Sequence, residues 1–282
     1  MRTRGQSFRL LGAACLLLPA AQQAPAQEPR VAMVGQAEIV FLGTVIGVGA
    51  ASFPGVPVSQ QTLVVRVDGV LDKPAAVKLG AGDSVTVEAR TAGSLRQGLQ
   101  ATFYTTGWIY GQGLAVREVG HEAVAGQLSA GAVSQQRDSM LQVRRQVSDT
   151  QLRARIRAAD MVVVGQVETI RPATLTALAP RPVPEHDPQW QEAIVLVESS
   201  IKGSQAGQRV VVRFPGSMDV AWYAMPRFAV AQQGTFLLRL DTISGTPKAM
   251  VAGREVPAYT VVSKQDLLST QDAARVQALS RP

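Results

Sequence analysis

The stretch Ala37-Glu38-Ile39-Val40-Phe41-Leu42-Gly43-Thr44-Val45 recurs later in the chain as Ala159-Asp160-Met161-Val162-Val163-Val164-Gly165-Gln166-Val167. In both copies a small residue and an acid precede an apolar block that ends in Gly-x-Val. A continuous apolar block of this length indicates a buried strand, and its glycine marks a bend or a bulge. The stretch therefore predicts two copies of one strand-rich unit.

Two further matches follow the first in the same order. Leu63–Val67 and Leu71–Lys73 match Ala193–Val197 and Ile201–Gly203, and Ala81–Val87 matches Ala206–Val212. The copies lie about 120 residues apart, whereas the repeats of a solenoid run about 20 to 50 residues. The pattern therefore indicates a duplicated domain.

The composition agrees with a mostly β protein. Of 282 residues, 46% are hydrophobic and 17% are charged, so the chain is able to bury a core. Its 25 Gly and 16 Pro favour short elements joined by turns. With further strands expected at 99–108, 113–119 and 235–240, each copy has about five short strands and suits a small closed barrel or a sandwich.

Helical patterns lie outside the two copies. Ser148 and Gln151 have the spacing of a capping box, and Ser263 with Asp266 is expected to begin a second helix. The expected apolar stripes are Leu152, Ile156 and Ala159 in the first helix, and Leu268, Val276 and Leu279 in the second.

Residues 1–26 have the pattern of a secretory signal peptide. Three arginines form a basic start, a short apolar run from Leu10 to Ala21 follows, and Ala24-Pro25-Ala26 supplies small residues for cleavage. We therefore expect an exported protein, periplasmic or secreted, whose mature form begins at Gln27. The remaining chain has no cysteine and no apolar run of membrane-spanning length, so we expect neither a disulfide framework nor a transmembrane segment.

The charge of the chain favours no nucleic-acid partner. Removing the three arginines of residues 1–26 lowers the formal net charge from +7 to +4, which is a mild excess. Basic residues gather in one segment, where they are expected to form a solvated helical face: Arg137, Arg144, Arg145, Arg153, Arg155 and Arg157, opposed by Asp138 and Asp149.

Three segments of the second copy carry a resemblance: Ala159–Gly165, Glu185–Trp190 and Val211–Pro215. Together they resemble exported bacterial proteins of uncharacterised function with tandem OB-like β-barrels. The resemblance covers the second half of the chain well and the first half loosely. The pattern of the second copy is also similar to that of the netrin-like barrels of protease inhibitors, although this chain has no disulfides. The resemblance implies an OB-like fold and no transferable activity.

The expected fold class is therefore mainly β, with two tandem small OB-like β-barrels, a helical connector and a C-terminal helix. The expected boundaries are a signal peptide at 1–26, a first barrel at 27–124, a connector at 125–158, a second barrel at 159–262 and a helix at 263–282.

Two histidines follow residue 26. Glu185, His186 and Asp187 are a candidate set of ligands for a divalent metal. The competing interpretation is a polar turn in which Asp187 or His186 caps backbone groups while Trp190 packs on the barrel. No other cofactor is predicted. His121 lies between Gly120 and Glu122 and is expected to be a solvated surface residue.

Two aromatic segments are candidate ligand-binding surfaces. If residues 102–110 form one regular strand, Tyr104, Trp108 and Tyr110 share a face that can stack sugar rings. In the second copy, Trp190, Trp222 and Tyr223 are candidates for lining a groove. The competing interpretation is that these rings cover the barrel.

No combination of nucleophile, base and acid stands out in the sequence. The sequence favours a non-enzymatic extracytoplasmic binding or scaffolding protein whose partner is an envelope protein or a glycan. The alternatives are a metal-dependent hydrolase that uses Glu185, His186 and Asp187, and an inhibitor of exported enzymes that uses the proline-rich segment 172–188.

Overall fold

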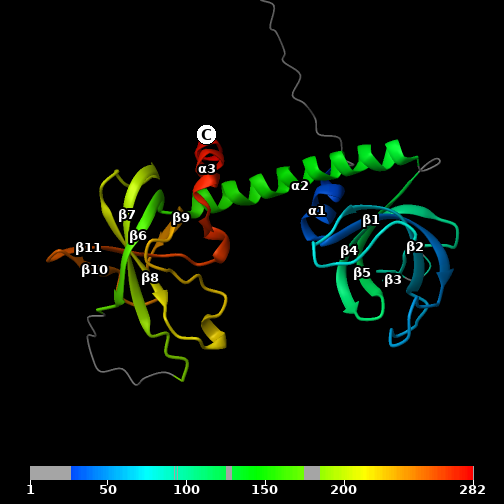
Figure 1. Cartoon of the computed structure of the whole chain (residues 1–282), viewed down its shortest axis with the longest axis horizontal. Coiled ribbons are helices and arrows are strands. Elements are labelled where there is room, and N and C mark those ends of the chain that lie inside the picture. The colour runs from blue at the N-terminus through cyan, green and yellow to red at the C-terminus, as the bar shows by residue number, and fades with distance from the viewer. Residues whose placement is uncertain (1–26, 92, 94, 125–128, 175–184, 282) are drawn as a thin grey trace, which may run out of the picture. The chain divides into compact units, whose positions relative to one another are not determined.

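A computed structural model describes residues 27–91, 93, 95–124, 129–174 and 185–281. The expected signal peptide lies outside these residues, as does most of the proline-rich segment. The chain divides into two compact units, Met1–Met140 and Leu141–Pro282, and the division falls inside the expected connector. Both units are built mainly of strands (Figure 1).

The elements of the first unit are α1 (Gln27–Gln36), β1 (Ile39–Val48), β2 (Thr62–Asp72), β3 (Ser84–Glu88), β4 (Gln100–Tyr110), β5 (Leu114–Ala123) and the start of α2 (Ala130–Ala158). The second unit contains the rest of α2, then β6 (Met161–Pro172), β7 (Trp190–Lys202), β8 (Arg209–Pro215), η1 (Val220–Trp222), β9 (Gln233–Leu240), β10 (Lys248–Val251), β11 (Arg254–Thr260), η2 (Lys264–Asp266), β12 (Leu267–Leu268), η3 (Thr270–Asp272) and α3 (Ala273–Ser280). The expectation of a mainly β chain with an intervening helix and a C-terminal helix is confirmed.

The two sheets share one pairing order. In the first unit the order is β1-β2-β3-β5-β4, with β4 paired back to β1 and β3 parallel to β5. In the second unit β6, β7, β8, β11 and β9 pair in the corresponding order, and β8 is parallel to β11. The pairing of β11 with β9 consists of Tyr259 with Leu240 and Thr260 with Arg239.

The likeness extends to the irregularities of the strands. The register of β1 on β2 shifts at three places, and the register of β6 on β7 shifts at the three corresponding places: between Val40/Phe41, Leu42/Gly43 and Val45/Gly47, and between Val162/Val163, Val164/Gly165 and Val167/Thr169. Bulges at corresponding positions support the duplication read from the sequence, because bulges are kept as features of a fold.

The glycine of each repeated stretch lies where two strands approach closely. A Cβ atom at Gly43 would lie 2.8 Å from the carbonyl oxygen of Arg66, and a Cβ atom at Gly165 would lie closer still to the carbonyl oxygen of Leu196. Because a backbone carbonyl in a paired strand cannot easily move, only glycine fits at either position. The sequence expectation of a bend or bulge at these residues is confirmed.

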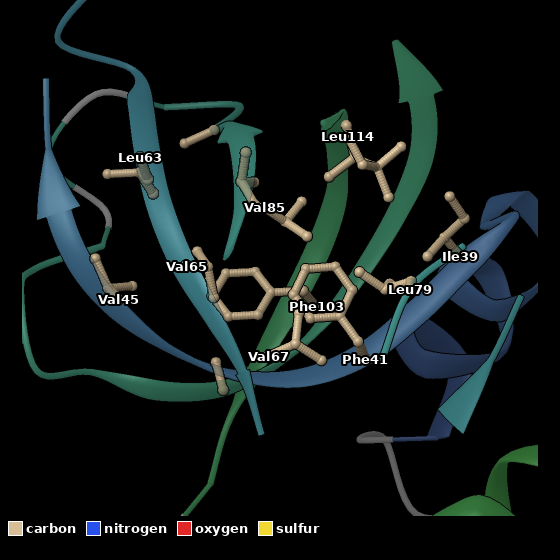
Figure 2. Packing of buried hydrophobic residues seen from close by; sticks show 14 of the residues in the cluster. Ile39, Phe41, Val45, Leu63, Val65, Val67, Leu79, Val85, Phe103 and Leu114 are labelled. Atoms are coloured by element: carbon tan, nitrogen blue, oxygen red, sulfur yellow. The ribbon is translucent and has the colours of Figure 1, made fainter. Parts of the chain in front are cut away.

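Alternation along the strands builds one apolar core inside each sheet. In the first unit Phe41 and Phe103 stack with their ring centroids 5.4 Å apart, and valines and leucines of the neighbouring strands surround them (Figure 2). In the second unit Phe214, Phe228 and Phe236 occupy the core. These rings fill the space that each curved sheet encloses. We therefore expect a functional site among the loops and not in the core.

In both units a segment of the chain covers the face of the sheet that points away from the apolar core, at Thr86 of β3 and at Val211 of β8. The covering segment differs between the two units. In the first unit the loop between β1 and β2 lies on this face: the amide of Ser52 donates to the hydroxyl of buried Thr86, and Phe53 packs against Gly113. In the second unit β10 covers this face, as the packing of Ala249 against Val211 shows. Val211 is the residue that corresponds to Thr86.

The β10 segment is held down by a buried charge network. The fully buried guanidinium of Arg213 donates to Glu192 at 3.0 and 3.1 Å and to Asp241 at 3.3 Å. It also donates to the carbonyl oxygen of Lys248 at 2.6 Å, while Arg171 pairs with Glu192 at 2.8 Å. Every charge in this network therefore has a partner, as a buried charge requires.

Three expectations for the helices are wrong. α2 is continuous, so Ser148 lies inside a helix and caps nothing at an N-terminus. Ser263 caps the 3-10 helix η2, and α3 begins ten residues later at Ala273. α1 lies within the segment expected to be barrel. Among the described residues, no helix is long and apolar enough to cross a membrane.

We expect Gly43→Ala to lower the free energy of unfolding of the full chain by about 1–3 kcal/mol, because the added methyl group is forced against the backbone of β2. Gly47→Ala is the matched control in the same strand, since its Cβ would have no neighbour closer than 3.7 Å. Urea unfolding of both variants measures the difference, and equal effects would contradict the steric argument.

We expect Arg213→Met to destabilise the second unit by about 3–5 kcal/mol, because it leaves the buried carboxylates of Glu192 and Asp241 without their partner. Arg209→Met on the same strand should change stability little, since the Arg209–Glu168 ion pair is exposed to solvent. Urea unfolding followed by tryptophan fluorescence compares the two, and a wild-type midpoint for Arg213→Met would contradict this role of the network.

Candidate functional site

Two loops of the second unit meet at the ends of β7 and β8. The amide of Gly216 donates to the carbonyl oxygen of Gln189 at 3.2 Å, and the amide of Ser217 donates to that of Pro188 at 3.0 Å. Arg227 fixes the second loop further by donating to the carbonyl oxygens of Pro215 and Ser217. The segments 185–190 and 216–223 therefore form one structure, here called the loop pair.

His186 and Asp219 join the two segments of the loop pair. The Nδ1 atom of His186 lies 2.8 Å from Oδ2 of Asp219, and the indole of Trp222 donates to the carbonyl oxygen of His186 at 2.9 Å. The hydrogen bond with His186, followed by one from the amide of Ala221, lowers the pKa of the Asp219 carboxyl below its usual value. A charged Asp219 is therefore part of how the loops stay together.

The aromatic residues of the loop pair do not form a flat platform. Trp190 and Trp222 are 5.6 Å apart at 63°, which is an edge-to-face arrangement, and both are half-buried. The ammonium of Lys264 lies 4.6 Å from the ring centroid of Tyr223. Trp190 and Trp222 thus stabilise the base of the loop pair, and Tyr223 stays at its surface.

Three large apolar side chains stand out from this base. Met218 is 80% exposed, Val220 is 85% exposed and Tyr223 is 68% exposed. All three lie in the segment that the hydrogen bonds of Asp219, Trp222 and Arg227 hold in place. They are here called the apolar ridge, and each is exposed on a segment that has a fixed base.

The predicted metal ligands do not converge. Asp187 accepts a hydrogen bond from the amide of Gln189 at 3.0 Å, Glu185 is exposed, and His186 pairs with Asp219 instead. In the part of the chain that the structure describes, no three His, Cys, Asp or Glu side chains form a group able to hold a metal ion. The backbone-capping interpretation is confirmed for Asp187.

The expectation that Tyr104, Trp108 and Tyr110 share a face is wrong. The register of β4 on β5 shifts between Gly107 and Ile109, so Trp108 is an extra residue that reverses the alternation. Tyr104 is fully buried and donates to Glu122 at 2.8 Å, and burial together with this bond raises the pKa of its hydroxyl. Trp108 is half-buried with Arg117 above its ring, and Tyr110 folds over Gly107.

The sequence suggested that His121 is a solvated surface residue, but its ring is paired with a buried carboxylate. A second shift in β5 leaves Val119 unpaired and brings Glu118 and His121 to one face, where Nδ1 of His121 lies 2.5 Å from Glu118. The carboxylate of Glu118 is 3% exposed, and its other oxygen accepts from the amide of Arg90 at 2.9 Å. Both carboxylate oxygens of Glu118 have a partner within the protein, so the position of Glu118 is fixed. Glu118 in turn orients the His121 ring.

We expect His186→Ala to raise the pKa of Asp219 towards its usual value, because the largest cause of the lowering is removed. A lowered pKa contributes stability above the pKa of the unfolded state, and this contribution is lost as the pH falls through the folded pKa. Carboxyl NMR titration measures the change, with His121→Ala as the control in the other unit. An unchanged pKa of Asp219 in His186→Ala would contradict the pairing.

No protein-family model matches this chain, and no curated protein is detectably similar to it. The case for a function therefore rests on the loop pair itself.

Proposed function

We propose that the chain is an exported, non-enzymatic binding or scaffolding protein of the cell envelope, built from two OB-like barrels, which binds a protein partner through the apolar ridge of the second unit. Export rests on the signal-like pattern of residues 1–26, and the OB-like assignment rests on the shared pairing order of the two sheets.

The observation that carries the proposal is the exposure of Met218, Val220 and Tyr223 on a fixed base. Each buried Å² of apolar surface stabilises a complex by about 25 cal/mol before the costs of association. A loop already held by hydrogen bonds loses little conformational entropy on binding, which favours affinity. Aromatic residues and methionine are also enriched at protein interfaces.

The geometry favours a protein over a glycan. A sugar ring stacks on the open face of an aromatic side chain, but Trp190 and Trp222 turn edge to face towards each other. The tips of the ridge, Met218 and Val220, are aliphatic and suit the apolar core of a protein interface.

The face on which OB-folds usually bind ligands is covered in both units, and this favours the ridge as the binding surface. OB-folds bind ligands on the face of their second and third strands and on the adjoining loops. In the first unit Ser52 and Phe53 lie on this face, and in the second unit β10 occupies it. The apolar ridge belongs to the connection after β8 and is not part of the segments that cover these faces.

The alternative functions have less support. A catalytic zinc usually has three protein ligands, whereas the loop pair brings together His186 and Asp219. An inhibitor would act through the segment 172–188, of which residues 175–184 lie outside the described part of the chain.

A photo-crosslinking amino acid at the exposed position Ala224, beside the ridge, tests the proposal in cells that express the full chain. We expect a discrete protein adduct whose yield falls about tenfold with Val220→Asp, because a charge on the ridge cannot be buried cheaply. The matched control is Val48→Asp, at a position that is 48% exposed in the first unit.

The control variant should leave the adduct unchanged. Equal losses in both variants, or no discrete adduct at all, would contradict a partner at the ridge. Loss of the adduct when purified envelope glycan is added would contradict a protein partner and would favour a glycan as the ligand.

A further inference from the structure

We propose that a hollow in the first unit binds the carboxylate of an apolar acid together with a proton on His121. The volume of the hollow is about 550 Å³, and residues of α1, of β5 and of the segment after β3 line it. The apolar ridge belongs to the other unit, so this proposal does not depend on the function proposed for the ridge.

A buried carboxylate orients the ring of His121 in this hollow. Nδ1 of His121 lies 2.5 Å from Oε1 of Glu118, whose side chain is 3% exposed. Because a charged carboxylate accepts hydrogen bonds and donates none, Nδ1 carries a proton and donates it to Glu118. The negative charge of Glu118 also stabilises a positive charge on the ring. The ring can therefore hold a second proton at Nε2, its other nitrogen.

The Nε2 atom of His121 is accessible to a ligand. His121 lines the hollow, and its side chain is 27% exposed. In the described part of the chain no group forms a hydrogen bond with Nε2, and Nε2 is not among the polar atoms that are buried without a partner. A ligand in the hollow can therefore accept a hydrogen bond from Nε2 when this atom is protonated.

Arg90 brings a second positive charge to the hollow. Its backbone amide donates to Oε2 of Glu118 at 2.9 Å, and its Nη1 atom donates to the carbonyl oxygen of Val119 at 3.0 Å. A carbonyl oxygen is neutral, and among the residues that the structure describes no carboxylate forms an ion pair with Arg90. The other N–H groups of this guanidinium can therefore donate to a ligand.

The other charged groups near the ring are already paired. Arg30 of α1 lies 3.6 Å from Glu122 of β5, and Glu122 accepts a hydrogen bond from Tyr104 of β4. The residue of β4 that meets the ring is Phe103, with the ring centroids 6.5 Å apart. The residues of α1 that line the hollow carry no charge. The charge of the hollow is therefore set by the arginine, the glutamate and the histidine described above.

These charges select a monoanion. Arg90 (+1) and a protonated His121 (+1) against Glu118 (−1) leave a net charge of +1. A carboxylate carries one negative charge, whereas a phosphomonoester carries about −1.5 to −2 at neutral pH. The two oxygens of a carboxylate suit one hydrogen bond from the guanidinium and one from Nε2. A carboxylate therefore balances the hollow and favours the protonated ring.

An apolar wall favours a carboxylate with an apolar body. Pro29, Ala32 and Met33 of α1 line the hollow. α1 approaches β5 closely here, since a Cβ atom at Gly120 would lie 3.1 Å from Cγ of Met33. Apolar groups of a ligand that cover these side chains remove apolar surface from water. Both an alkyl carboxylate and the carboxyl end of a peptide have this chemistry.

NMR titration of the mature chain, residues 27–282, tests the proposal, because its two histidines give separate ring signals. The probes are hexanoate, an alkyl carboxylate, and N-acetyl-leucine, which stands for a peptide end. N-acetyl-leucinamide is the uncharged control ligand. At pH 5.5 we expect the signal of His121 to shift saturably on at least one arm, with a dissociation constant below about 5 mM, while that of His186 stays in place. The arm that binds more tightly identifies the source.

The affinity should fall about tenfold when the pH is raised from about 5.5 to about 7.5. A ligand that needs the protonated ring loses affinity as the ring loses its proton, and an unperturbed histidine does so near pH 6.5, while the carboxylate probes stay charged. Equal affinity at both pH values would contradict the protonated ring and overturn the proposal.

Variants of the hollow are compared by calorimetric titration at pH 5.5. His121→Asn keeps a donor beside Glu118 but removes Nε2, so we expect binding to weaken at least about tenfold. Arg90→Gln should weaken it at least about fivefold. Arg96→Gln makes the same change of charge at an exposed position of the same connection, outside the hollow, and should change binding less than about twofold. Circular dichroism checks that each variant keeps the fold.

Three results would overturn the site. Equal weakening by Arg90→Gln and Arg96→Gln would show a diffuse effect of net charge. Equal affinity for N-acetyl-leucine and N-acetyl-leucinamide would show an apolar contact without recognition of the carboxylate. The absence of a saturable shift of the His121 signal with both carboxylates would show that the hollow binds neither.

Discussion

The close approach of the first strand to the second at Gly43 and Gly165 is the constraint on which both sheets depend. With no side chain at this point, β1 and β6 bend enough to pair with two neighbours along their first halves and with one beyond. The bend directs each sheet back onto its own first strand, and the apolar cores form inside it. Loops emerge from fixed strand ends, which is why segments such as the loop pair have a defined base.

The sequence contains this architecture because its signals are local and are stated twice. An apolar block, its terminal glycine and the order of three matches predict the strands and the duplication. The bulge at the glycine of the repeated apolar block is predictable, but the two bulges of the β4–β5 pair leave no mark in the hydrophobic pattern. A bulge at Trp108 places Tyr110 on the opposite face from Tyr104, and a bulge at Val119 brings Glu118 to His121. These two errors in the first unit therefore have the same physical origin.

The loop pair shows the other limit of sequence reasoning. Its members Glu185–Trp190, Trp222 and Tyr223 were predicted from their residue types, yet the partner that organises them was not. Asp219 lies 33 residues from His186, and neither the distance nor the pairing has a local signature. The contact between α2 and α3 is a similar case, since Arg275 is 126 residues from Asp149. Residue type marks a candidate, and long-range contact decides what it does.

The buried network around Arg213 has a consequence for the order in which the second unit folds. Arg213 gathers partners from β7, from the segment after β9 and from β10, which are separated from it by 21 to 35 residues. Until the last of these segments arrives, the charged groups are better solvated by water than by an incomplete set of partners. Docking of β10 should therefore be a late and cooperative event, after the transition state has formed the rest of the sheet. The first unit covers its equivalent face with a loop anchored by neutral hydroxyl groups, so it faces no such delay.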